Sequence, residues 1–407
     1  MRSFSHTIWR KKKKPVVHPL REKGNMNGSF SKKRAISLDL ARGFMLLLIV
    51  MAHAPLLLYG SGPGIMSRPE SVTFLDKLLN SIGELFIDNR ARSLFSVLFG
   101  YGLVMMFENQ LSKGCSKKEA KKTIRRRSLY LILFGFILTV FIGGQDILMT
   151  YGVAGLLVSW LLLRQNKVLI TVTVFVTLIV VSYLPFVWGF LLYQNGRYGF
   201  STVFSTNHDY MQSVMEAMFY FPMIPLLIHF LFPVLPSVLA GMWFGRKQLF
   251  TKVLQPSRRL KTVAAIGIAI SILGALPLVL IGELWEPSLF LAGIVYGIHI
   301  ITGIAGGIGY AALFGILGNL LKNPGWFIKS LTSLGKRSLT FFVLNETLLV
   351  LLFSPVALGL GGVLDNTGAT FVAISIWVLA VAIAYVLERY HMNGPLESLM
   401  RHLVYKK

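Results

Sequence analysis

Cysteine and acidic residues are scarce in this chain. Its 407 residues include one cysteine, Cys115, and only 17 Asp and Glu against 41 Lys and Arg. A single cysteine excludes a disulfide framework and every metal site built from several cysteines. Charged residues make up only 14% of the chain, about half the share in soluble proteins. No polar stretch is long enough to fold by itself, which excludes a separate soluble enzyme domain.

Three common catalytic and nucleotide-binding motifs are also absent. The sequence contains no Walker A loop, no His-Glu-x-x-His pair and no Gly-x-Ser-x-Gly elbow. These absences argue against a P-loop nucleotidase, a zinc protease of that type and an α/β-hydrolase. We therefore predict no metal site and no tightly bound cofactor.

Long apolar runs dominate what is present, and 54% of the residues are hydrophobic. Runs of about 20 apolar residues are typical of transmembrane helices. The fold class we predict is all-α, a polytopic membrane helical bundle with about ten transmembrane helices. The expected spans are Ile36–Tyr59, Ser93–Phe107, Leu129–Ile142, Leu148–Leu163, Val168–Leu192, Met223–Trp243, Val263–Ile281, Leu289–Leu320, Ser338–Phe353 and Phe371–Leu387.

The basic residues are distributed unevenly among the loops between these spans. Of the 41 Lys and Arg residues, 35 lie in the two terminal segments and in every second loop between the spans. These stretches are 1–35, 108–128, 164–167, 244–262, 321–337 and 388–407. Cytoplasmic loops carry such an excess, so both termini are expected to be cytoplasmic. The net charge of +24 is then explained by anionic lipid, and a nucleic-acid partner is not expected. We expect a multi-pass protein of a bacterial plasma membrane.

The polar N-terminal segment differs from the rest of the chain. We predict a disordered basic cytoplasmic tail at 1–35 and a single membrane domain at 36–407. Lys11 to Lys14 are consecutive, and the segment lacks the apolar core of a signal peptide. Translation starting at Met26 is an equally open reading, and the intact mass of the protein would decide between the two.

The first predicted span carries three ionisable residues, Asp39, Arg42 and His53. Charged groups inside a bilayer are costly and are seldom incidental. Arg42 and His53 are eleven residues apart, or three turns plus about 20°, so they share one helix face. His53 is a candidate general base, Asp39 joins it as a candidate catalytic residue, and Arg42 could bind an anionic cofactor group. Alternatively, Asp39 and Arg42 neutralise each other, and His53 bonds a neighbouring carbonyl.

Two further clusters could take part in chemistry. Arg90 and Arg92, with Ser96, are candidate substrate-binding residues at the outer entry of the second span, where they could equally form an interfacial anchor. In the ninth span, Asn345 is a candidate substrate-binding residue and Glu346 a candidate catalytic residue. A glutamate inside the membrane needs a partner, and both Arg42 and His53 qualify. Simple hydrogen bonding between helices is the alternative.

Four blocks of sequence resemble the YeiB-like membrane proteins. They are Arg34 to His53 with Leu38-Asp39-x-x-Arg42-Gly43, Arg92–Gly102, Gly335–Thr340, and Gly394-Pro-Leu-Glu397 with Arg401. The resemblance extends from Lys33 over nearly the whole chain. It implies a C-terminal family domain of unknown function at roughly 223–407.

This family is distantly similar to the membrane acyltransferases that include heparan-alpha-glucosaminide N-acetyltransferase. The bacterial members carry an Arg, ten residues, then a His in their first helix, a spacing that Arg42 and His53 reproduce. The resemblance implies that His53 is the catalytic base and that Arg42 positions the acyl donor. Acetyl-CoA or another acyl-CoA would be the co-substrate. The acceptor would be a hydroxyl or amine on a cell-surface glycan or lipid.

Two other functions remain open at this point. A small-solute transporter or permease would also line its path with intramembrane polar groups. A non-catalytic membrane protein that supports envelope assembly is the third possibility. The sequence does not indicate an oligomeric state.

Overall fold

A computed structural model describes residues 36–66, 68–200, 203–204, 209–250, 258–321 and 323–405. Over these residues the protein is all-helical, with no β-strand beyond isolated bridges, which confirms the predicted class. The predicted tail at 1–35 and the alternative start at Met26 lie outside the described residues. The α-helices are α2 (Ile36–His53), α3 (Phe74–Ile82), α4 (Arg90–Ser112), α5 (Lys117–Ile137), α6 (Leu148–Val158), α7 (Asn166–Asn195), α8 (Tyr210–Tyr220), α9 (Ile224–Leu231), α10 (Leu235–Lys247), α11 (Arg258–Leu280), α12 (Leu289–Leu320), α13 (Trp326–Lys336), α14 (Ser338–Phe353), α15 (Asn366–Arg389) and α16 (Pro395–Tyr405). Shorter helical turns are η1 (Ala54–Leu57), η2 (Gly83–Ile87), η3 (Leu138–Ile142), η4 (Ser159–Leu163) and η5 (Leu360–Gly362).

Six helical stretches of the described chain are long and apolar enough to cross a membrane, and a seventh is added if the bent pair α8 and α9 counts as one span. Apolar helices of Leu148–Leu163 and Ser338–Phe353 are shorter. The protein therefore has the character of a multi-pass membrane protein, and the count of ten remains a prediction. The six stretches are Ile36–Leu57, Phe74–Ser112, Asn166–Asn195, Arg258–Leu280, Leu289–Gly318 and Asn366–Arg389.

The expected span Met223–Trp243 is wrong as a single helix. α9 ends at Leu231 and α10 begins at Leu235, while α8 and α9 meet at a bend of 71°. Pro225 and Pro236 stand in the first turns of α9 and α10, and Pro233 lies between the two helices. Proline lacks the amide proton used in a helix interior and is tolerated best in the first turn, so this cluster of three divides the segment, whereas the single prolines Pro185 and Pro277 stay inside α7 and α11.

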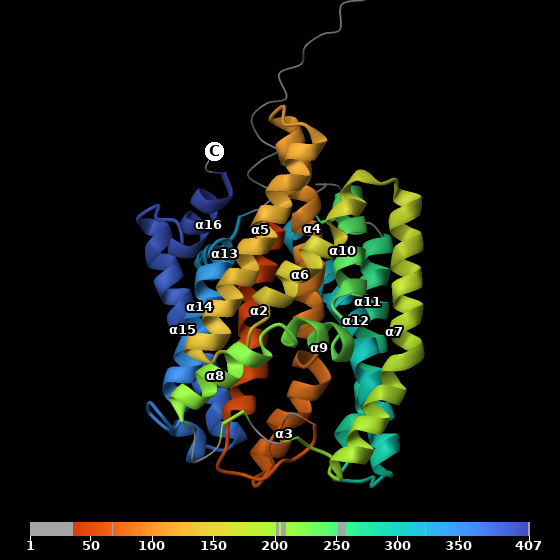
Figure 1. Cartoon of the computed structure of the whole chain (residues 1–407), viewed down its shortest axis with the longest axis vertical. Helices are drawn as coiled ribbons and strands as arrows, with labels where there is room; N and C mark the ends of the chain where they lie inside the picture. The colour runs from red at the N-terminus through yellow and green to blue at the C-terminus, as the bar shows by residue number, and fades with distance from the viewer. Residues whose placement is uncertain are drawn as a thin grey trace, which may run out of the picture.

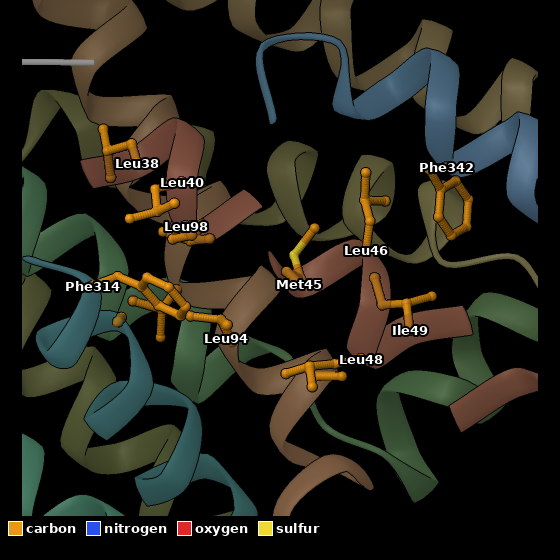
Figure 2. Packing of buried hydrophobic residues seen from close by; sticks show 14 of the residues in the cluster. Leu38, Leu40, Met45, Leu46, Leu48, Ile49, Leu94, Leu98, Phe314 and Phe342 are labelled. Carbon is orange, nitrogen blue, oxygen red and sulfur yellow. The ribbon is translucent and has the colours of Figure 1, made fainter. Parts of the chain in front are cut away.

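Helix α2 lies at the centre of the bundle (Figure 1). α13, α14 and α15 flank it on one side, and α4, α10 and α12 lie on the other. Its side chains Met45, Leu46 and Leu48 are buried with Leu94 of α4 and Phe314 of α12 (Figure 2). Burial of apolar surface on every side fixes the position of α2, and with it the polar residues that α2 carries.

Close contact between α2 and α13 depends on two glycines. A Cβ atom added at Gly43 would lie 2.1 Å from the Leu331 carbonyl oxygen, and one at Gly335 would lie 1.7 Å from the Asp39 carbonyl oxygen. Backbone atoms cannot yield as a flexible side chain can. The two helices therefore touch backbone to backbone, as small residues permit in membrane bundles.

Replacing Gly335 by alanine should lower the stability of the protein by about 3 kcal/mol, because the added methyl group forces α13 away from α2. Thermal melting in detergent, followed by size-exclusion chromatography, would measure the loss. Gly325→Ala is the matched control, since nothing lies within 4 Å of a Cβ at Gly325. Equal melting temperatures for the two variants would contradict this account of the contact.

Candidate functional site

Two cavities lie toward opposite ends of α2. The first, of about 520 Å³, is lined by His53 and Ile49 and is here named the His53 cavity. The second, of about 920 Å³, is lined by Asp39 and Arg42 and is named the Arg42 cavity. α4 also lines both cavities. Ala91 and Arg92, at its start, line the His53 cavity, and residues from Phe95 onward line the Arg42 cavity. Opposite ends of α2 and α4 thus face different chambers.

His53, in the wall of the His53 cavity, forms a hydrogen bond with Glu346, which does not itself line the cavity. His53 Nδ1 lies 2.7 Å from Glu346 Oε1, although the residues are 293 positions apart. The Glu346 side chain is fully buried, and that of His53 is 16% exposed. With Glu346 ionised, Nδ1 carries the proton and donates it, so Nε2 is the basic nitrogen left for a ligand. Of the two expected partners of Glu346, the structure selects His53.

The end of α2 explains the position of His53. His53 is the last residue of α2, and Pro55 follows in the first turn of η1. Pro55 lacks the amide proton of a helix interior, and the chain changes from α-helical to 3-10 hydrogen bonding directly after His53. Glu346 reaches this point from the middle of α14, where it is surrounded by apolar residues of the bundle.

Asp146 also lines the His53 cavity, in the loop 143–147 between η3 and α6. Its carboxylate accepts hydrogen bonds from the amides of Leu148 and Met149, at 2.7 and 2.9 Å, at the start of α6. The loop lies outside the candidate spans. Burial raises the pKa of Asp146 to about 7, against the lowering effect of those two amides. Sequence reasoning missed Asp146. The available signal was an aspartate in a tight hairpin between two apolar runs.

Two ion-binding side chains define the polar side of the same cavity. Arg68 donates to both carboxylate oxygens of Asp88, from Nε at 2.8 Å and from Nη2 at 3.0 Å. Burial lowers the pKa of Arg68, but the Asp88 carboxylate, with smaller contributions from Glu84 and Tyr296, leaves that pKa raised overall. The Arg92 guanidinium lies 4.2 Å from the centre of the Phe232 ring and donates to Asn89 Oδ1 at 3.0 Å. The charge of Arg68 is already neutralised by Asp88. Arg92 is therefore the better candidate in this cavity to bind an anionic group of a ligand.

Arg90 does not line the cavity. It is fully buried and donates to Ser271 Oγ at 2.7 Å, to the Ser271 carbonyl at 2.6 Å and to the Glu84 carbonyl at 2.7 Å. Its ring of partners ties the start of α4 to α11. The structure therefore gives Arg90 a packing environment and leaves Arg92 as the member of this pair that faces a ligand space.

The remaining predicted residues have distinct positions. Ser96 is fully buried, donates to the Arg92 carbonyl at 2.7 Å and lies 3.0 Å from the Tyr151 hydroxyl. Asn345 is also fully buried, and neither of its amide atoms has a hydrogen-bond partner in the described protein. Neither residue lines the His53 cavity or the Arg42 cavity.

The Arg42 cavity is basic. Arg42 Nη1 lies 3.4 Å from Asp39 Oδ1, as the three-residue spacing predicts. Glu397, an acidic residue in the wall of this cavity, already has hydrogen-bond partners, because its carboxylate accepts from the amides of Leu339 and Thr340. Arg127, Lys336 and Arg401 add three basic side chains and Glu108 one more carboxylate, so four basic groups face three acidic ones in the lining. Such a set favours an anionic ligand.

These helices and cavities define the class of the protein, a multi-pass helical membrane protein with a polar site at each end of its central helix. Residues 244–407 match the model of a family described as a protein of unknown function (DUF418). This match confirms the predicted resemblance of the C-terminal part to the YeiB-like proteins. It includes Glu346 and Arg401, whereas Arg42 and His53 precede it.

One curated relative gives a weaker match. The uncharacterized protein YxaH of Bacillus subtilis (strain 168) is 33% identical over 114 residues, which are 28% of this chain and 27% of that protein. The chain thus aligns with about a quarter of the length of the relative. Neither comparison bears on acyl transfer, and the function must be argued from the site.

Proposed function

We propose that this protein is a membrane acyltransferase that moves an acyl group, acetyl in the simplest case, from acyl-CoA to a hydroxyl or amine. The observation that supports this most is the 2.7 Å contact between His53 Nδ1 and Glu346 Oε1 beside a cavity. A histidine whose Nδ1 is held by a carboxylate, with Nε2 free toward a ligand space, is the arrangement of a general base. His53 and Glu346 form the base, and Arg42 binds the donor.

The transfer step uses His53 Nε2 twice. Nε2 takes the proton of the acceptor hydroxyl or amine while the acceptor atom bonds to the thioester carbonyl carbon. The tetrahedral intermediate then collapses and the carbon–sulfur bond breaks. The proton returns from Nε2 to the departing sulfur, which leaves as the thiol of CoA. Glu346 stays ionised and stabilises the imidazolium between the two proton transfers.

The charge distribution supports a direction for this reaction. With ten spans and both termini in the cytoplasm, the Arg42 cavity opens to the side where acyl-CoA is made. The basic segment of residues 113–127, which includes the start of α5, would concentrate the anionic CoA near that mouth. The His53 cavity then receives an acceptor from the opposite side of a bacterial plasma membrane. A cell-surface glycan or lipid carries the required hydroxyl or amine.

Reconstitution into liposomes tests the proposal. Radiolabelled acetyl-CoA is supplied, and a total lipid extract and a surface-glycan extract of the producing cells serve as acceptors. Protein-dependent appearance of label in either extract is the expected result. Label that remains entirely in acetyl-CoA with both extracts would overturn the proposal and would favour a supporting role in envelope assembly.

A solute transporter is the second candidate, because the two cavities lie toward opposite ends of one helix. Uptake of a solute into the liposomes without acetyl-CoA would favour this reading. His53, held by Glu346, would then line the solute's path.

Arg42→Ala should raise the KM for acetyl-CoA about tenfold and leave kcat nearly unchanged. The reason is the loss of a charge-assisted contact to the donor's anionic groups, which is worth about 1.5–3 kcal/mol. Initial rates at varied acetyl-CoA concentration would measure the split. Arg259→Ala is the control, since Arg259 is exposed at the start of α11 and lines neither cavity. A loss of kcat at unchanged KM would contradict a donor-binding role.

A further inference from the structure

The two cavities share one lining residue, Tyr151 of α6. Its neighbours in sequence divide between the chambers, with Ile147 and Thr150 on the His53 cavity and Leu148 on the Arg42 cavity. The Tyr151 side chain is only 1% exposed. The residue therefore stands between the two spaces, at the point where they come closest to joining.

The phenol of Tyr151 is held at both its hydroxyl and its ring. The hydroxyl donates to the Arg92 carbonyl at 2.9 Å and lies 3.0 Å from Ser96 Oγ. The ring packs against Phe95 and Phe99, with centroids 4.4 and 5.3 Å away. All four partners belong to α4, so the ring closes the gap between α6 and α4.

The backbone behind Tyr151 has no freedom to move aside. A Cβ atom at Gly152 would lie 2.6 Å from the Ser128 carbonyl oxygen, and one at Gly155 would lie 2.4 Å from Ser128 Oγ. α6 is thus pressed against α5. Because Tyr151 is the lining residue that the two cavities share, rotation of its side chain is the smallest movement that would join them.

We propose that Tyr151 is the partition between the donor cavity and the acceptor cavity and that it restricts the transferred group to a short acyl chain. This inference rests on the proposed function, because Arg42 binds the donor on one side of the ring and His53 lies on the other. The thioester must reach His53 past the ring. The acyl group passes the ring ahead of the thioester, so an acetyl group adds only two carbons to what must pass, whereas a long acyl chain must be drawn past the ring over its whole length.

Chain-length selectivity provides the first test. Acetyl-CoA and octanoyl-CoA are compared with the parent protein, Tyr151→Phe and Tyr151→Ala. The parent and Tyr151→Phe should prefer acetyl-CoA. Tyr151→Ala should shift the ratio of the two rates toward octanoyl-CoA by at least about tenfold, since differences of methylene size in a pocket are worth that much. Tyr390→Ala is the control, because Tyr390 is 74% exposed at the end of α15.

Side-specific cysteine labelling tests the partition without any enzymatic activity. In a Cys115→Ser background, Ala52→Cys reports on the His53 cavity and Asn109→Cys on the Arg42 cavity. A small membrane-impermeant methanethiosulfonate should label each position from one side of the liposome only, and the two sides should differ. Adding Tyr151→Ala should make the cysteine at position 52 reactive from both sides.

The outcomes separate the two proposals. If the parent transfers no acyl group but Tyr151→Ala opens position 52 to both sides, the proposed function fails and the partition stands. If the parent transfers acetyl but Tyr151→Ala keeps the parent's chain-length ratio, the restriction by Tyr151 is wrong. One-sided labelling that persists in a correctly folded Tyr151→Ala protein overturns the partition.

Discussion

Replacing His53 by alanine should lower the rate of acetyl transfer by about a thousandfold, which is typical for loss of a positioned general base. The carboxylates that line the described His53 cavity already have partners, Asp146 in two amides and Asp88 in Arg68, so we expect neither to replace the imidazole. The rate would be measured as label transferred from acetyl-CoA at saturating donor. The KM for acetyl-CoA should change little, because His53 lies outside the Arg42 cavity.

Two further variants make this result interpretable. His53→Ala leaves the buried Glu346 carboxylate without its partner, so part of any loss could come from instability. His53→Gln retains an amide that can donate to Glu346 but cannot act as a base. It should be as inactive as the alanine variant and melt closer to the parent. His402→Ala, exposed on α16, should keep full activity. An active His53→Gln protein would rule out the histidine as base.

The sequence predicted long helices well and a broken one badly. The spans predicted at Leu289–Leu320 and Ser338–Phe353 coincide with α12 and α14. α12 proves to be one unbroken helix of 32 residues, about 48 Å long. The segment Met223–Trp243 failed because hydropathy averaged over a window does not register a break when both halves are apolar. The cluster of prolines carried the signal, but a single proline does not decide, since α7 and α11 continue through Pro185 and Pro277.

Within the site, local spacing was informative and long-range pairing was not. The pair Asp39 and Arg42 follows from a three-residue interval on one helix. The partner of Glu346 could be narrowed only to Arg42 or His53, because helix order does not fix which faces meet. Arg90 and Arg92 could not be separated by role either. Their two-residue interval turns them about 200° apart on a helix, and only packing decides which one faces the cavity.

Tyr151 shows what sequence reasoning could not reach at all. A tyrosine in an apolar helix is usually a packing residue, and its role as a divider depends on two cavities that no pattern predicts. Asp146 is similar, because its place beside His53 depends on how the hairpin 143–147 folds back toward α14. Gly144 of this hairpin packs against Glu346, since a Cβ atom added at Gly144 would lie 3.3 Å from the Cβ of Glu346.

Glu346→Gln should lower kcat for acetyl transfer by about a hundredfold to ten-thousandfold and leave the KM for acetyl-CoA unchanged. The physical reason is orientation and charge. An amide can donate to His53 Nδ1 and so favour the wrong tautomer, with the proton on Nε2, and it cannot stabilise the imidazolium. Glu346 does not line the Arg42 cavity, so donor binding should be unchanged.

The melting temperature of Glu346→Gln distinguishes a catalytic role of Glu346 from a packing role. Glu346 Oε2 is buried without a hydrogen-bond partner in the described protein, so an ionised carboxylate here is costly to bury. Replacing it with a neutral amide of the same shape should leave the melting temperature equal or higher while activity falls. Glu283→Gln, on an exposed loop where Glu283 pairs with Lys77, is the matched control and should retain the parent's rate. If Glu346→Gln instead melted lower and kept its kcat, the His53–Glu346 bond would serve to join α2 to α14, and the base would need another partner.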